Sequence, residues 1–148
     1  MASESARMSS AAEARFRVQA PNSKQRVVKI IALDPSSEEI VRRLAAASWN
    51  QASFHSAASF IRNLKEEVET ADLVVMVSAP GGLAAAAAPI GEACSARRVM
   101  TTALIVGAAS ASDDELSKTL AQLRPWSLMT VIANADDYIH DMLTALRA

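Results

Sequence analysis

The fold is decided by a run of five apolar residues near the middle of the chain, Leu73-Val74-Val75-Met76-Val77. The run is continuous and does not alternate with polar residues, which is typical of a strand whose two faces are both covered by helices. Four further apolar segments alternate with segments of helical period, and they lie at residues 27–33, 52–55, 99–106 and 126–133. Five such strand–helix cycles predict an α/β fold of three layers, in which a doubly wound, five-stranded parallel sheet lies between helices.

The common strand order of such a sheet is 2-1-3-4-5, the order of flavodoxin-like and receiver-like domains. The direction of winding then reverses between the first and third strands, and ligands bind beyond the carboxyl ends of the strands at that reversal. We therefore expect any ligand-binding site between the two loops that follow these strands. The candidate binding residues are Asp34, Ser36, Ser37, Ser78, Gly81 and Gly82.

The loop after the third strand, Ala79-Pro80-Gly81-Gly82, fits a type II turn, because proline presets the first central residue and glycine allows the positive φ of the second. Such a turn can free backbone N–H groups to hold a phosphate or a carboxylate ahead of a helix. A tight crossover that requires glycine explains the same residues, and they match neither common glycine-rich nucleotide motif. Neither candidate loop contains lysine or arginine, so a bound phosphate would depend on backbone dipoles alone.

The same region resembles the strand and the glycine-rich signature loop of tubulin-like GTPases over about twenty residues, from residues 71–75 through Gly81-Gly82 to Ala87-Ala88-Pro89. Where that family alternates glycine and threonine, this chain has Leu83 and five alanines. Its first strand ends in Asp34-Pro35 and not in a glycine-rich turn. These departures remove the phosphate cradle, so the sequence does not assign the chain to that family.

Acidic residues gather at three predicted helix starts, in residues 34–39, 113–115 and 136–137. A metal or phosphoryl-transfer site, as in response-regulator receivers, is the functional interpretation, and helix capping is the simpler one, which we favour. Receivers need a phospho-accepting aspartate after the third strand and a lysine after the fifth. This chain has Ser78 and Asn134 at those places, so we predict no metal site.

Local signals predict where several helices begin. Ser36 with Glu39, and Ser112 with Glu115, have the three-residue spacing of a capping box. Pro89 follows five alanines and favours a helix that begins near it, since proline is tolerated at the first helical position, although a kink at Pro89 is the alternative. After the second strand we expect one helix, with a buried stripe formed by Phe60, Ile61, Leu64 and Val68.

Composition and charge exclude several classes of protein. The chain has 148 residues, of which 51% are hydrophobic and 21% charged, as expected for one soluble domain. Its only cysteine, Cys94, permits no intramolecular disulfide, so a reducing cytoplasmic location is expected. A net charge of −1 argues against general nucleic-acid binding. The nineteen uncharged residues 73–91 could span a membrane by length, but the Pro-Gly-Gly break would leave backbone groups unpaired in lipid, so no membrane partner is expected.

The charge is distributed unevenly along the chain. Residues 1–30 hold six basic and two acidic side chains, a net charge of +4, and the remaining residues carry −5. We predict that residues 1–25 form a disordered basic N-terminal tail and that residues 26–148 form a single α/β domain.

Candidate catalytic side chains are few. His55 lies beside Ser56 and Ser59, so a base-activated serine is formally open. Neither His55 nor His140 has the flanking pattern of a nucleophile elbow, and Cys94 falls on an apolar helical stripe. We therefore name no catalytic residue and identify no cofactor.

These observations leave two functional hypotheses. The first is a non-catalytic regulatory or protein-interaction domain that binds a protein partner or forms a homo-oligomer. The second is a binder of, or enzyme for, a nucleotide or small anionic metabolite at the reversal between the first and third strands.

Overall fold

The five predicted strands form one parallel sheet. The computed structural model describes residues 26–81, 84–133, 136–146 and 148. Its strands are β1 (Val28–Ala32), β2 (Ala52–Ser56), β3 (Leu73–Ser78), β4 (Met100–Val106) and β5 (Met129–Ala133). They lie in the order β2-β1-β3-β4-β5 and every neighbouring pair is parallel. The predicted flavodoxin-like, doubly wound order 2-1-3-4-5 is confirmed.

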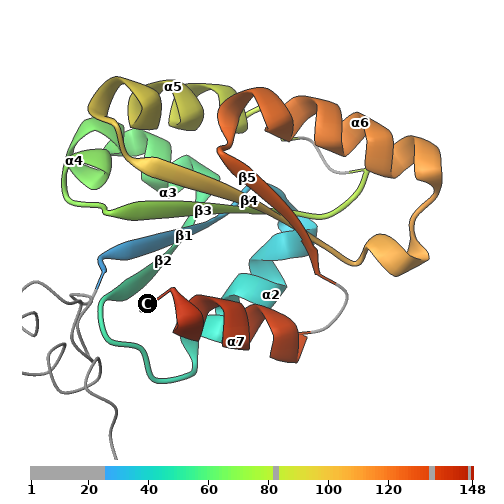
Figure 1. Cartoon of the computed structure of the whole chain (residues 1–148), viewed down its shortest axis with the longest axis horizontal. Coiled ribbons are helices and arrows are strands. Elements are labelled where there is room, and N and C mark those ends of the chain that lie inside the picture. Colours follow the sequence, from blue (N-terminus) through green and yellow to red (C-terminus); the bar gives the residue numbers. More distant parts are fainter. Residues whose placement is uncertain (1–25, 82–83, 134–135, 147) are drawn as a thin grey trace, which may run out of the picture.

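Helices cover both faces of the sheet (Figure 1). On one face lie α2 (Pro35–Ala45) and α7 (Asp136–Ala145), and on the other lie α3 (Ala57–Arg62), α4 (Leu64–Glu69), α5 (Ala87–Arg97) and α6 (Asp113–Leu123). Two short 3-10 helices, η1 (Ala108–Ser110) and η2 (Arg124–Trp126), flank α6. The result is the predicted arrangement of three layers.

The core is divided into two parts by the sheet. Every residue of β3 is buried, and its side chains alternate between the two parts: Val75 and Val77 pack toward α2 and α7, and Val74 and Met76 pack toward α3 to α6. The continuous apolar run therefore has the predicted cause, since a strand covered on both faces has no side exposed to water.

Helix α2 begins two residues earlier than the sequence predicted. Asp34, not Ser36, is the N-cap, Pro35 is the first helical residue, and Ser37 completes the capping box. The serine at position 37 can replace the expected glutamate because its hydroxyl oxygen also accepts the N-cap N–H. At α6 the predicted box of Ser112 and Glu115 is confirmed.

Three other boundaries differ from the sequence-based expectation. The helix expected after β2 is two helices separated by Asn63, and Ile61 is 38% exposed and lies outside the buried stripe. Helix α5 begins at Ala87, so Pro89 is its third residue, where a missing N–H still costs no helical bond. Strand β5 begins at Met129 and not at Trp126, because residues 124–126 form η2.

Among the residues that the structure describes, no helix is long and apolar enough to cross a bilayer.

Candidate functional site

Asp34 joins the carboxyl ends of β1 and β3, the place where the winding reverses. Its Oδ1 accepts a hydrogen bond from the backbone N–H of Ser37 at 2.9 Å. Its Oδ2 accepts one from the hydroxyl of Ser78 at 2.8 Å and one from the backbone N–H of Ala79 at 3.0 Å. The carboxylate is 4% exposed and lies at the N-terminus of α2, where the helix dipole favours a negative charge.

Ser37 adds a second link between the same two strands. Its buried hydroxyl lies 3.0 Å from the carbonyl oxygen of Asp34 and 3.0 Å from that of Val77. The hydroxyl donates a hydrogen bond that these two acceptors share. The backbone N–H of Leu33 also donates to the carbonyl of Val77, at 2.9 Å. Asp34, Ser37 and Ser78 thus come together as their positions in the chain suggested, but both serines are hydrogen-bonded to Asp34 and all three residues are buried.

Ser36 faces a hollow above this buried network. The hollow has a volume of about 290 Å³. It is lined by Ser36, Ile40, Ala79, Pro80, Val106, Gly107, Ser110, Ala111 and Glu115. It therefore lies over the carboxyl ends of β1, β3 and β4, where the strand order predicts a ligand.

The loop after β3 is held against α6. Gly81 has φ +82°, as expected for the second central residue of a type II turn, and its N–H donates to the hydroxyl of Thr119 at 3.1 Å. The N–H of Ala84 donates to Oε1 of Gln122 at 2.9 Å. These backbone donors, which the anion-binding interpretation needs to be free, are bonded to side chains of α6. The remaining predicted residue, Gly82, lies outside the described residues.

Glu115 gives the hollow a negative rim. Its Oε1 completes the N-terminal cap of α6 with Ser112, and a methyl group placed on Gly81 would lie 2.5 Å from its Oε2. Among the described residues, no lysine, arginine or histidine lines the hollow. The carboxylate of Glu115 would repel an anion at this hollow, whereas it would not repel a neutral or cationic ligand.

A second polar cluster, which was not predicted from the sequence, lies under α4. Nζ of Lys29, on β1, lies 2.7 Å from Oε2 of Glu67 and 2.5 Å from the hydroxyl of Thr70. Nε2 of His55, on β2, lies 2.8 Å from the hydroxyl of Ser53 and 3.7 Å from the same Glu67 oxygen. One feature of the sequence could have indicated this cluster: Lys29 lies within an apolar strand, and a buried lysine needs a partner.

This cluster corrects the proposed environment of His55. Ser56 caps α3 by accepting the N–H of Ser59, whereas the imidazole contacts Ser53. Burial lowers the pKa of His55, while the charge of Glu67 raises it and that of Lys29 lowers it. The hydrogen bond from Lys29 lowers the pKa of Glu67.

The cluster does not have the geometry of a catalytic triad. A triad needs the serine at one imidazole nitrogen and the acid at the other. Here Ser53 and Glu67 both approach Nε2 of His55. The arrangement is an ion pair that fastens α4 to the sheet.

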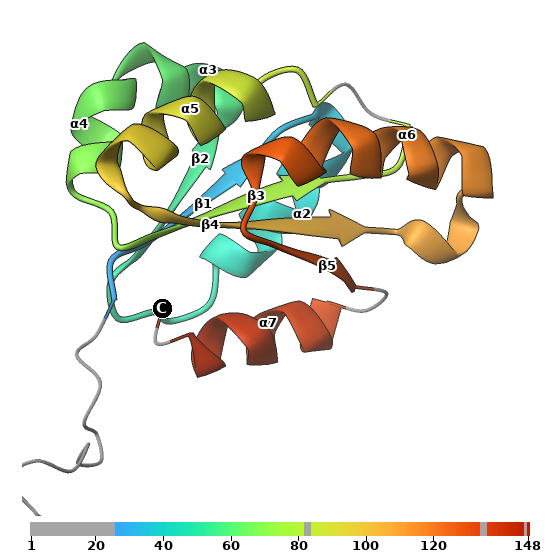
Figure 2. The ribbon, with the colours of Figure 1, turned by 45° about the horizontal axis from the view of Figure 1, so that its top comes forward.

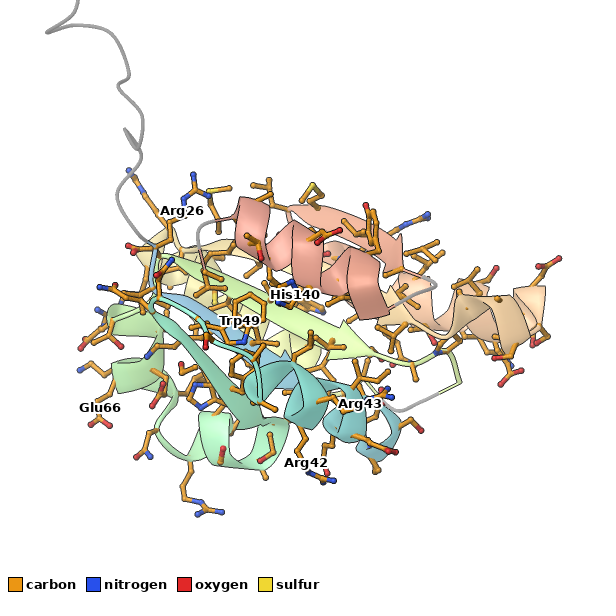
Figure 3. The ribbon with its side chains drawn as sticks, turned by 90° about the horizontal axis from the view of Figure 1, so that it is seen from below. Arg26, Arg42, Arg43, Trp49, Glu66 and His140 are labelled. Atoms are coloured by element: carbon orange, nitrogen blue, oxygen red, sulfur yellow. The ribbon has the colours of Figure 1, made fainter. Side chains whose placement is uncertain are left out.

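The two other side chains considered for catalysis, Cys94 and His140, lie outside this cluster. Cys94 is fully buried, and burial raises the pKa of its thiol to about 11. His140, on α7, points toward Trp49, with ring centroids 4.9 Å apart (Figure 3). Within residues 26–81, 84–133, 136–146 and 148, no three His, Cys, Asp or Glu side chains are placed to share a metal ion.

Comparison with known proteins gives a similarity of backbone only. No family model matches the chain, and no curated protein matches it. The signal receiver domain of NarL from Mycobacterium tuberculosis is similar, with a TM-score of 0.48 and 12% sequence identity over 84% of this chain and 98% of that one. The flavodoxin-like fold follows from the strand order itself.

Proposed function

We propose that this chain is a non-catalytic regulatory or protein-interaction domain that acts through its surface. The observation that carries the proposal is that Ser37 and Ser78 are both hydrogen-bonded to the buried carboxylate of Asp34 at the point where the winding reverses. A catalytic acid, base or nucleophile has to reach its substrate, and these three buried groups do not.

The electrostatics of the site support the same proposal. The carboxylate of Asp34 is bonded to the N–H of Ala79, which lines the hollow, and Glu115 lines the hollow itself. The backbone donors of Gly81 and Ala84, which could otherwise hold an anion, are bonded to α6. An anionic substrate would therefore lose its hydration shell without gaining a cation or a free donor from these groups.

A small-ligand function is the second candidate, and the hollow of about 290 Å³ favours it. In this alternative the chain binds, or acts on, a nucleotide or a small anionic metabolite next to Ser36. The negative rim makes neutral and cationic analogues necessary members of any ligand panel.

A thermal-shift screen separates the two functions. A ligand present at a hundred times its dissociation constant stabilises a protein by about 2.7 kcal/mol, which is readily seen as a rise in Tm. We expect no rise with nucleotides, flavins, sugar phosphates or their neutral and cationic analogues, and we expect association with a protein in solution.

Two matched variants locate any ligand that does bind. Ser36→Tyr fills the hollow, whereas Ser117→Tyr places the same side chain on the exposed face of α6. A ligand whose stabilisation is lost in Ser36→Tyr and kept in Ser117→Tyr would overturn the proposed function and establish the alternative.

A further inference from the structure

Strand β5 lies at one end of the sheet formed by the described strands. The order β2-β1-β3-β4-β5 ends at β5, which pairs with β4 alone among the described strands. Figure 2 shows β5 at the edge of the sheet, between α6 and α7. Natural edge strands are normally protected by charges, prolines or bulges, because their free backbone groups can pair with another chain. Residues 128–133 contain neither a charged residue nor a proline.

Exposed apolar side chains gather at this edge. Six large apolar side chains are exposed in the described part of the chain, and four of them lie on β5, just before it, or at the start of its neighbour β4. They are Leu128 (74% exposed), Met100 (50%), Met129 (47%) and Ile132 (44%). We refer to these four side chains and the outer backbone of β5 as the β5 edge.

The β5 edge is apolar on both faces of the sheet. Val131 and Ala133 pack into the core beneath α2 and α7, so the alternation of a strand places Met129 on that face and Ile132 on the opposite one. A hollow of about 690 Å³ adjoins the start of the strand, lined in part by Trp126 and Leu128. Glu92 and Arg98, of opposite charge, also line it.

The charged residues that flank β5 in the sequence have opposite signs. Arg124, which is exposed, precedes the strand by five residues, and Asp136 and Asp137 follow it by three and four residues. A second β5 running antiparallel would place the arginine end of each strand beside the acidic end of the other. A parallel copy would place like charges together, which is unfavourable.

We propose that the β5 edge binds a second copy of this chain, with the two β5 strands paired antiparallel about a two-fold axis. The proposal rests on the proposed function and names its partner. Antiparallel pairing is the isologous arrangement in which a patch meets itself, and it would join the two sheets into one through backbone hydrogen bonds. The apolar side chains on both faces would then be buried against their equivalents.

The test is the oligomeric state of the full chain, measured by sedimentation equilibrium over a range of concentrations. We expect the wild type to be a dimer and Ile132→Lys to be a monomer, because the lysine places like charges across the two-fold axis. Ile61→Lys is the matched control, since Ile61 is an exposed isoleucine on α3, away from this edge, and this variant should remain a dimer. Circular dichroism confirms that each variant is folded.

Charge reversal tests the antiparallel pairing. Arg124→Glu should raise the dimer dissociation constant by about tenfold or more, because it brings acidic groups together. Asp136→Arg with Asp137→Arg should raise it similarly, and the combination of all three changes should restore it. The antiparallel arrangement is overturned if Arg124→Glu and the double change Asp136→Arg, Asp137→Arg each weaken the dimer and the combination of all three changes does not restore the dissociation constant.

The outcomes separate this inference from the proposed function. A wild-type chain that is monomeric at every concentration, or one in which both lysine variants behave alike, overturns the inference. If that monomer binds a different protein through another surface, the proposed function stands without it. A dimer that also gains stability from a ligand in the hollow supports the inference and overturns the proposed function.

Discussion

The carboxylate of Asp34 accepts a hydrogen bond from the hydroxyl of Ser78, 44 residues away in the sequence, with 2.8 Å between the two oxygens. The contact joins the end of β1 to the end of β3, and the N–H of Ala79 strengthens it. In an open doubly wound sheet these two strand ends line the crevice where ligands bind. In this chain the polar groups at these strand ends are hydrogen-bonded to one another, and these bonds join the end of β1 to the end of β3.

Substitutions in the hydrogen-bond network of Asp34 should destabilise the protein by different amounts, with Asp34→Ala costing more than Ser78→Ala. Asp34→Ala leaves three donors without their acceptor and removes the cap of α2, so we expect a loss of about 2–4 kcal/mol in the free energy of unfolding. Ser78→Ala removes one of these donors and should cost about 1 kcal/mol. Ser48→Ala, at an exposed serine, serves as the control and should stay within about 0.5 kcal/mol of the wild type. Urea unfolding measures all three, and equal losses for Asp34→Ala and Ser78→Ala would contradict the central role of the carboxylate.

Two glycines with positive φ should respond differently to alanine. Gly81 has φ +82° and its added methyl group would meet Glu115. Gly107 has φ +71°, and no described residue lies within 4 Å of its added methyl group. Gly107→Ala should therefore cost only the left-handed backbone conformation, about 1 kcal/mol. Gly81→Ala should cost more. Combining Gly81→Ala with Glu115→Ala, and correcting for Glu115→Ala alone, isolates the clash; a coupling of zero would show that the clash is absent.

The partly buried His55 should make the stability depend on pH. The folded state holds the pKa of His55 below the ordinary value of 6.5, mainly through burial. As the pH falls through 6.5 the unfolded chain binds a proton before the folded chain does, so the stabilising contribution is present above this pH and is lost as the pH falls toward the folded pKa. The pKa of Glu67 is also lowered, from 4.5, so its contribution is lost at lower pH.

Urea unfolding at several pH values between about 7.5 and 5.5 measures the effect of His55. We expect the free energy of unfolding of the wild type to fall across this range, and the fall to be smaller in His55→Gln, which removes the titrating group. Identical slopes in the two proteins would show that the imidazole does not contribute.

The thiol of Cys94 should be protected in the folded state. It is fully buried on α5 and its pKa is raised to about 11, so very little of the nucleophilic thiolate forms at neutral pH. We expect an aromatic disulfide reagent to modify it only as the chain unfolds, with a rate that rises with urea in parallel with the unfolded fraction. Rapid modification without denaturant would contradict the burial.

The elements of this fold follow closely from local patterns. The apolar run of β3 predicts a strand covered on both faces, because no alternating arrangement would remove all five side chains from water. The box at Ser112 and Glu115 predicts the start of α6, because a capping box is satisfied within four consecutive residues. The capping box at α2 was misplaced for a related reason: Asp34, Ser36 and Ser37 can all cap a helix, and the choice among them depends on the strand beside them.

The residues that surround the candidate site follow from the sequence only in part. Their meeting at the carboxyl ends of β1 and β3 is a consequence of strand order, and 2-1-3-4-5 is the common order for the five parallel strands that the sequence predicts. Whether they are free to bind is decided by partners far along the chain: Ser78 for Asp34, Val77 for Ser37 and Thr119 for Gly81. Lys29 likewise meets Glu67 across 38 residues. Burial and periodicity are properties of a few neighbouring residues, so the chain itself specifies the layers and the order of the sheet. The satisfaction of a hydrogen bond is a property of two surfaces in contact, so only the packed structure decides that these polar groups are bonded to protein partners. The same holds for the outer edge of β5, which has no strand partner in the part of the chain that the structure describes.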